Sequence, residues 1–379
     1  AGARLAAAVA APEAREEEPG EEAWYFKEYG RVATHREMLE DEVRTKAFRK
    51  AILAVCRGKV VLDVGCGSGI LSLFAAQAGA LRVVAIEGSA RTAELAREAV
   101  SRNGLSDRIT VVCGRVEDEA VADEVDELLR QAQASRGRAA QADVIVSEWM
   151  GYMLVHEDMF PSVALARDRW LAPGGRMMPA GCSLWAAPFC GEDFLDEVQG
   201  FWLRRPYGLD LSHLAAPAVE EIVDRPVIDI LEAPRMLAPA AKLWRLPCAT
   251  APVAAPRTQR LPFDFEVNRS GALHGLAVWF QCTLAPSIGF STGPAATSTH
   301  WAQTLLFFAG GSRAGSSAPG ADLNGFGVGP GDRISGELRW ETTGRSMCVG
   351  VEGTLDRPQV SQEPQSFSTE FDWSLRLES

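Results

Sequence analysis

The feature that most constrains the fold is a glycine-rich turn placed between an apolar run and a helical pattern. Residues 59–64 read KVVLDV, residues 65–69 read GCGSG, and an apolar helical pattern runs from Ile70 to Ala78. The apolar run predicts a buried strand. Glycines after such a strand let the backbone approach a ligand closely and leave the amides of the following helix free. The turn therefore predicts a parallel α/β sheet with a ligand at its carboxyl edge.

The same alternation continues along the first half of the chain. A helix signal lies at Thr34 to Glu37, which have the spacing of a capping box and precede apolar residues on one face at Leu39, Val43 and Ala47. Further strands are predicted at 83–86, 109–113 and 143–146. The acidic and then Gln/Ala/Arg-rich segment 117–141 predicts a helix and a loose surface loop. We expect a doubly wound, Rossmann-like domain over residues 21–179.

From about residue 180 the pattern changes to short strands separated by Gly and Pro. This texture predicts an antiparallel β domain over residues 180–379, with strands at 276–280 and 334–340 and a long exposed loop at 310–331. Residues 1–20 are rich in Ala, Glu and Pro and are interpreted as a disordered tail rather than a signal peptide.

The turn itself indicates which ligand it binds. A dinucleotide fingerprint, GxGxxG, needs glycine where this chain has Ile70. The chain instead has the pattern GxGxG at Gly65, Gly67 and Gly69, and Glu87 ends the next predicted strand. This arrangement fits S-adenosylmethionine better, because a carboxylate there can accept hydrogen bonds from both ribose hydroxyls. The alternative is a tight turn without a ligand and a solvated Glu87.

A second motif places two acids together. Glu148 ends the predicted strand 143–146 in the stretch SEWMGY, and Glu157 follows nine residues later. Two facing carboxylates repel each other unless a cation lies between them. A guanidinium is such a cation, since it is planar, permanently charged and has five N–H donors. The pair predicts a clamp for an arginine side chain; the alternative is two unrelated surface glutamates.

With these motifs the chain resembles the protein arginine methyltransferases. Tyr25 and Tyr29 match the family's YFxxY motif, residues 61–69 match its cofactor loop, and Glu148 with Glu157 match its double-glutamate loop. Two more matches are the HxxMxxDxxR helix, at His35, Met38, Asp41 and Arg44, and the THW loop at 299–301. The matches follow the family order from about residue 24 to residue 301.

The resemblance implies a role for each matching residue. Glu148 and Glu157 would hold the substrate arginine, and His300 would pair with Asp41 and act as a further catalytic residue. The remaining roles are those of cofactor-binding residues, His35, Arg44, Asp63, Gly65, Gly67, Glu87, Val116 and Glu117, and of substrate-pocket residues, Tyr25, Tyr29, Met38, Met159 and Trp301. The segment 117–141 is longer than in the family.

The resemblance also implies a product and an assembly. The THW loop resembles the type I branch, which makes asymmetric dimethylarginine, and residues 273–280 are most similar to the sixth mammalian subtype. The resemblance implies that the second half is an antiparallel β-barrel domain. Residues 194–216 resemble the helical arm that projects from this barrel and through which the family forms dimers, so a homodimer is expected. The cofactor implied is S-adenosylmethionine, with no metal, because a sulfonium already makes its methyl group electrophilic.

Composition limits the partners. The formal net charge of −12 disfavours direct binding to nucleic acid and favours basic protein substrates. Eight scattered cysteines without a CxxC pair disfavour a zinc site or disulfide framework and favour a reducing, intracellular location, cytoplasmic or nuclear. No apolar run reaches the about 18 residues of a membrane span. Two alternatives to an arginine methyltransferase stay open: a small-molecule methyltransferase, and an inactive protein that keeps the methyltransferase fold for binding a partner.

Overall fold

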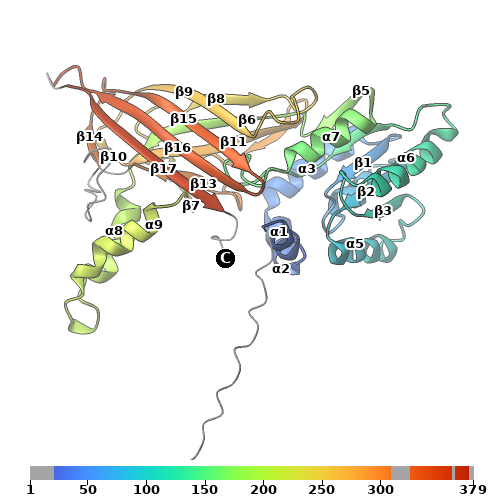
Figure 1. Ribbon diagram of the computed structural model, residues 1–379, viewed down its shortest axis with the longest axis horizontal. Helices are drawn as coiled ribbons and strands as arrows, with labels where there is room; N and C mark the ends of the chain where they lie inside the picture. Colours follow the sequence, from blue (N-terminus) through green and yellow to red (C-terminus); the bar gives the residue numbers. More distant parts are fainter. Residues whose placement is uncertain (1–20, 309–324, 361–362, 375–379) are drawn as a thin grey trace, which may run out of the picture.

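The computed structural model describes residues 21–308, 325–360 and 363–374, and contains an α/β part, an antiparallel β part and a projecting pair of helices (Figure 1). The helices are α1 (Glu21–Tyr29), α2 (Val32–Glu40), α3 (Glu42–Val55), α4 (Ile70–Gln77), α5 (Ala90–Arg102), α6 (Glu119–Ala134), α7 (Phe160–Trp170), α8 (Glu192–Leu203) and α9 (Ala215–Val223), with short 3-10 turns at Pro206–Gly208, Ser212–Leu214 and Ala233–Arg235. None of the helices in these ranges is long and apolar enough to cross a membrane.

The first half forms a parallel sheet with strand order β3-β2-β1-β4-β5. Its strands are β1 (Val60–Val64), β2 (Arg82–Glu87), β3 (Ile109–Cys113), β4 (Ala142–Val146) and β5 (Leu171–Met178). Every residue of β1 and β4 is buried, as in a sheet covered by helices on both faces. Since β1 pairs with both β2 and β4, the strand order reverses beside β1, which is where such sheets bind ligands.

The predicted strands and the helix after the glycine turn are confirmed, but the predicted capping box is wrong. Thr34 lies inside α2, and its hydroxyl donates to the carbonyl of Glu28 at 3.2 Å. The cap that does form is at Asp41, which interrupts the predicted helix and accepts the amide of Arg44 at 2.9 Å. Residues 32–55 therefore form two helices that meet at Asp41, and Leu39, near the end of α2, is exposed.

Segment 117–141 contains the predicted helix, α6, but its loop is held in place. Arg136 and Arg138 both donate to Asp143, at 2.6 and 2.8 Å, and Gln133 donates to the carbonyl of Gln141 at 2.6 Å. The prediction of a loose loop is therefore wrong here: paired charges bind it to the first residues of β4.

The second half is built from antiparallel sheets, one with the order β7-β13-β11-β6-β8 and with β12 paired to β11, a second with the order β17-β16-β15-β9, and a ribbon of β10 and β14. The strands are β6 (Gly181–Phe189), β7 (Val227–Asp229), β8 (Ala241–Leu246), β9 (Thr258–Glu266), β10 (Gly271–Leu273), β11 (Gly275–Ala285), β12 (Ile288–Ser291), β13 (Gln303–Phe307), β14 (Phe326–Val328), β15 (Arg333–Thr343), β16 (Ser346–Asp356) and β17 (Gln365–Ser374). The predicted strands at 276–280 and 334–340 are confirmed as parts of β11 and β15.

Part of the predicted loop at 310–331 is a strand instead. Residues 326–328 form β14, which pairs with β10 through Gly271↔Val328, so the loop prediction is wrong there. Residues 309–324, and the tail expected at 1–20, lie outside the described residues. Helices α8 and α9 project together from the sheets of the second half (Figure 1).

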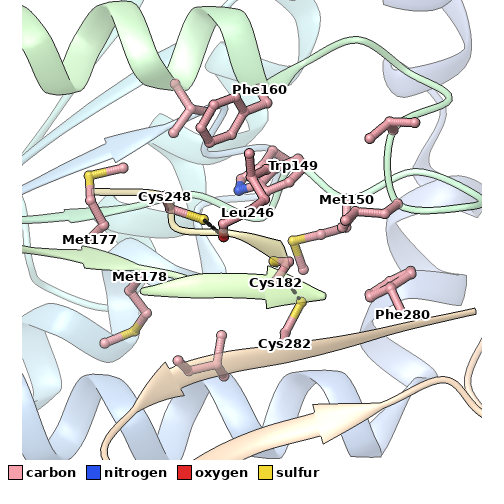
Figure 2. Packing of buried hydrophobic residues seen from close by; sticks show 14 of the residues in the cluster. Trp149, Met150, Phe160, Met177, Met178, Cys182, Leu246, Cys248, Phe280 and Cys282 are labelled. Atoms are coloured by element: carbon pink, nitrogen blue, oxygen red, sulfur yellow. Dashed lines mark hydrogen bonds between the residues drawn. The ribbon is translucent and has the colours of Figure 1, made fainter. Parts of the chain in front are cut away.

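The two halves share one apolar core (Figure 2). Trp149 and Met150, in the loop after β4, belong to the same buried cluster as Cys182 of β6, and as Phe280 and Cys282 of β11. Cys182 and Cys282 are register partners on adjacent strands, with their sulfur atoms 3.2 Å apart, and all eight cysteines are free thiols. The loop that follows Glu148 is thus supported from below by strands of the second half.

Candidate active site

A cleft opens at the carboxyl edge of the parallel sheet, beside β1. It encloses about 1100 Å³, part of it open to solvent. Of the residues predicted to form the site, those that line it are Tyr25, Tyr29, His35, Met38, Arg44, Gly65, Gly67, Glu87, Val116, Glu117, Glu148, Glu157 and Met159. The structure thus brings together segments as far apart in the sequence as Tyr25 and Met159, which are separated by 134 positions.

The glycine turn forms the floor of the cleft. The amide of Gly67 donates to one carboxylate oxygen of Glu87 at 2.8 Å, and the amide of Ser89 donates to the other at 2.8 Å. Gly65 and Gly67 have φ values of 70° and 54°. The positive φ favours glycine at both positions, and a Cβ atom on Gly65 would also displace the flexible end of Met159, whose Cε would lie 2.3 Å away.

Two acids, Asp63 beneath the floor and Glu87 at the cleft itself, are held in a water-poor environment. Asp63 is buried; Ser72 donates to its Oδ2 at 2.6 Å, while its Oδ1 has no hydrogen-bond partner among the described residues. Burial raises the pKa of Asp63 to about 7. Burial also raises the pKa of Glu87, although backbone amides oppose the shift. Glu87, which lines the cleft, is therefore an acceptor that a ligand with N–H or O–H donors would satisfy.

Glu148 lies on one side of the cleft and is paired with Arg44. Nε and Nη2 of Arg44 donate to Oε2 of Glu148 at 3.0 and 2.6 Å, and both side chains are less than a tenth exposed. Nη1 of Arg44 donates to the carbonyl of Met38 at 3.2 Å. The sequence assigned Arg44 to the cofactor and Glu148 to the substrate, whereas the structure joins the two directly.

Glu157 reaches the same cleft from a sharply bent loop. Met153, Leu154 and Asp158 all have positive φ, at 49°, 71° and 46°, and Gly151 forms a bridge with Leu154. The bends bring Glu157 back beside Gly151, where a Cβ atom would lie 2.9 Å from its Cγ. Glycine at position 151 is thus what lets the two ends of the loop meet.

Two tyrosines of α1 cover Glu157. The hydroxyl of Tyr25 donates to Oε2 of Glu157 at 3.3 Å, and the rings of Tyr25 and Tyr29 lie 4.6 Å apart. Burial and the neighbouring Glu157 carboxylate raise the pKa of both tyrosines well above the usual value. Both hydroxyls therefore stay protonated and act as donors toward the acid.

Helix α2 adds His35 to the same wall. Its Nε2 donates to the carbonyl of Tyr29 at 2.9 Å, and its Cε1 lies 3.2 Å from the position of a Cβ on Gly67. Burial lowers the pKa of His35, so the imidazole is neutral at pH 7 and Nδ1 is an acceptor.

Beyond Glu87 the cleft is bounded by Val116 and Glu117. Val116 is buried and Glu117 is exposed. Ser162 donates to Oε1 of Glu117, and Arg115 donates to Oε2 at 3.4 Å. An apolar side chain beside an acceptor suits a flat heterocycle with an exocyclic donor.

Three predicted site residues do not line the cleft. Asp63 lies beneath the floor. His300 donates from Nδ1 to Asp41 at 2.7 Å, and Trp301 donates from Nε1 to the carbonyl of Met150 at 2.9 Å. The predicted pairing of His300 with Asp41 is confirmed, whereas Trp301, predicted to form a wall of the pocket, lies behind Met150 and holds the loop after Glu148 through its indole.

Among the described lining residues that the sequence did not single out, one comes from the second half of the chain. Arg345, in the turn between β15 and β16, reaches the cleft from the second half of the chain. Its neighbours in the sequence form no motif, so no pattern along the chain pointed to it.

Comparison with known proteins identifies the family. Residues 180–317 match the family model of the arginine methyltransferase oligomerization subdomain, and residues 47–163 match that of ribosomal protein L11 methyltransferase. The chain is 34% identical to a probable protein arginine N-methyltransferase 6 of Arabidopsis thaliana, over 75% of this chain and 70% of that protein, and 36% identical to protein arginine N-methyltransferase 6 of Xenopus laevis, over 75% and 80%.

The chain belongs to the protein arginine methyltransferases. A solved structure of PRMT6 superimposes with a TM-score of 0.69 at 30% identity, covering 83% of this chain and 96% of that one. Arabidopsis protein arginine methyltransferase 10, solved in an open conformation, gives a TM-score of 0.70 at 28% identity, covering 92% and 99%. The Rossmann-like fold followed by an antiparallel barrel is thereby confirmed, as is S-adenosylmethionine-dependent methylation of protein arginines.

The residues of the cleft fit S-adenosylmethionine. The acceptor carboxylate of Glu87 and the positive-φ glycines of the floor suit a ligand that carries ribose hydroxyls, and the unpartnered buried oxygen of Asp63 lies directly beneath these glycines, at the end of β1 that adjoins them in the sequence.

Proposed function

We propose that this arginine methyltransferase is a type I enzyme, which makes monomethyl- and asymmetric dimethylarginine, and that Glu148 and Glu157 grip the substrate guanidinium. The observation that carries the proposal is that the two acids, from different ends of one loop, line a single cleft with the glycine floor and Glu87. Similarity to relatives named protein arginine N-methyltransferase 6 supports the type I product.

The cofactor would lie along the floor. In this proposal His35, Arg44 and Asp63 contact its methionine part with Gly65 and Gly67, Glu87 holds its ribose, and Val116 and Glu117 hold its adenine. Bound S-adenosylmethionine supplies an electrophilic methyl group. Tyr25, Tyr29, Met38 and Met159 would enclose the space between this methyl group and the two acids.

The residues of the chain must orient the substrate guanidinium, which is a poor nucleophile. A guanidinium has a pKa above about 12, so it is almost entirely protonated at pH 7. Two carboxylates binding its far nitrogens would fix its plane, aim one nitrogen at the methyl group and draw positive charge away from that nitrogen. His300 would serve as a positioning residue through Asp41, and Trp301 through Met150.

We further propose a homodimer of chains that each contain a cofactor domain at 21–179 and a barrel domain at 180–379. The arm at about 194–216 exposes apolar side chains near its tip, with Tyr207 97% and Leu209 62% exposed. The match of residues 180–317 to an oligomerization subdomain supports this assembly. Eight free thiols support an intracellular location, cytoplasmic or nuclear.

The decisive experiment supplies the purified protein with labelled S-adenosylmethionine and an arginine-containing peptide, and identifies the product by mass spectrometry. We expect asymmetric dimethylarginine. Glu148→Gln and Glu157→Gln should each bind the cofactor and lose at least about a hundredfold in turnover, since each removes half of the charge that orients the substrate. Glu98→Gln, a change at an exposed ion pair of α5, is the matched control and should be fully active.

Full turnover by both clamp variants would contradict the proposed roles of the two acids. Symmetric dimethylarginine, or methylation confined to small molecules, would contradict the proposed class of enzyme.

A further inference from the structure

Arg345 extends from the barrel and contacts both the ring of Tyr25 and the main chain of Glu157. Its guanidinium carbon lies 4.0 Å from the centre of the Tyr25 ring, and its Nη1 donates to the main-chain carbonyl of Glu157. The residue follows Gly344, whose φ of 65° lets the hairpin between β15 and β16 turn tightly. A single side chain of the second half thus contacts both the first helix and the loop of the double-glutamate motif.

The two contacts of Arg345 converge on one acid. Tyr25, whose ring lies under the guanidinium, donates its hydroxyl to Oε2 of Glu157 at 3.3 Å. Arg345 therefore fixes the side chain of Glu157 through Tyr25 and fixes its main chain directly. A guanidinium is well suited to this double task, because it can stack on an aromatic face and donate in its own plane at the same time.

The loop needs such support from outside. Its three residues with positive φ, Met153, Leu154 and Asp158, adopt a backbone conformation that is unfavourable for non-glycine residues and persists only where surrounding contacts impose it. The barrel supplies a second contact at the next residue, where Nε of Arg257 lies 3.1 Å from Oδ2 of Asp158. The amide of Thr342 donates to the carbonyl of Arg257 at 2.8 Å, so both arginines belong to one corner of the barrel.

We propose that Arg345 is a positioning residue for the methyl transfer: it ties the barrel to α1 and to Glu157 and so fixes the acid that holds the substrate. The proposal rests on the proposed role of Glu157. It gives the barrel a part in the reaction within a single chain, in addition to the part that its arm plays in assembly.

The test compares Arg345→Ala and Arg345→Lys with Arg339→Ala. Arg339 lies in the same hairpin, on β15, but pairs with Glu352 and Glu370 outside the cleft. Hydrogen exchange of the full-length, ligand-free protein is measured in α1 and in residues 151–158. We expect Arg345→Ala to raise exchange there by roughly tenfold, Arg345→Lys to restore part of the protection, and Arg339→Ala to match the wild type.

Kinetics supply the second half of the test. Arg345→Ala should lower kcat/KM for the peptide by roughly tenfold, and its loss should not multiply with that of Tyr25→Phe in the double variant, because both act on Glu157. Unchanged exchange with lowered kcat/KM would mean that Arg345 meets the substrate itself, and would overturn the proposal. Unchanged values of both quantities would also overturn it. Raised exchange in Arg345→Ala together with an active Glu157→Gln variant would instead refute the role of Glu157 in catalysis.

Discussion

Arg44 donates from two nitrogens to one oxygen of Glu148, at 3.0 and 2.6 Å, within a site where both side chains are almost fully buried. The acid proposed to hold a substrate guanidinium is therefore already in contact with a guanidinium of the protein. The pair links α3 to the end of β4 across 104 positions of the sequence. It keeps the charge of Glu148 compensated when no substrate is present.

Removing Arg44 should destabilise the protein strongly. Arg44→Ala leaves the buried Glu148 carboxylate without its cation, which typically costs about 3–5 kcal/mol, and Arg44→Lys should cost less because the charge is kept. Urea denaturation at pH 7.5 measures the difference. Arg102→Ala, at an exposed pair with Glu98, is the control and should stay within about 0.5 kcal/mol of the wild type. Equal losses in the two alanine variants would contradict the importance of the buried pair.

Asp63 should make stability depend on pH in a defined range. Its pKa is raised to about 7 in the folded protein, against about 3.9 in an unfolded chain. The folded state therefore binds its proton more tightly, and the cost of burying Asp63 grows as the pH rises from about 4 and levels off above about 7. Asp63→Asn keeps an acceptor for Ser72 and removes this cost, which is on the order of a few kcal/mol.

The melting temperature of the ligand-free protein, followed from pH 4 to pH 8, tests this expectation. The advantage of Asp63→Asn over the wild type should grow with pH and then stay constant. Asp107→Asn, at a carboxylate that is 75% exposed, should show no such trend. A difference that is independent of pH would show that Asp63 titrates normally.

Trp301→Phe should weaken the contact that holds the loop after Glu148, while the aromatic packing at position 301 is kept. The smaller ring can still stack on Phe290, whose ring centre lies 5.7 Å away, but the hydrogen bond to the carbonyl of Met150 is lost. A buried carbonyl left without its donor costs about 1–3 kcal/mol. Chemical denaturation and kcat should both report the loss, and Trp185→Phe, whose bond is to the half-buried Ser183, should lose less.

The projecting arm should control assembly. Replacing Tyr207 and Leu209, the most exposed large apolar residues of the arm, by serine removes the apolar contact expected between subunits. We expect the wild type to sediment at about twice its mass of 40.9 kDa and the double variant at the monomer mass. Val253→Ser, at an exposed position away from the arm, is the control. A double variant that still sediments as a dimer would place the interface elsewhere.

Elements with a strong local pattern were predictable from the sequence. The strand at Ile109–Cys113 is an apolar run with no competing signal, and the glycine turn is dictated by backbone conformations that other residues avoid. The predicted helix start at Thr34 is wrong, since α2 already begins at Val32, directly after Arg31 in the extended conformation, and no side chain caps that end. The spacing of residues along the sequence does not distinguish a helix that starts after Thr34 from one that starts at Val32.

Contacts between distant segments were beyond local pattern. The predicted contact of His300 with Asp41 came from a family motif, whereas the pairing of Arg44 with Glu148 and the contact of Arg345 with Glu157 join residues 104 and 188 positions apart. Residue types and their periodicity indicate which charged side chains can lie in a site. They do not indicate which partner the folded chain will give each of them.

The apolar cluster shared by the two halves has a practical consequence. It extends from Phe48 in α3 to Trp373 in β17, and the loop after Glu148 contributes Trp149 and Met150 to it. A fragment that ended near residue 179 would expose these side chains to water, and a barrel expressed by itself would expose Cys182 and Phe280 in turn. Chimeras with other methyltransferases must therefore match the buried surface of both partners, and unfolding should proceed as one cooperative transition.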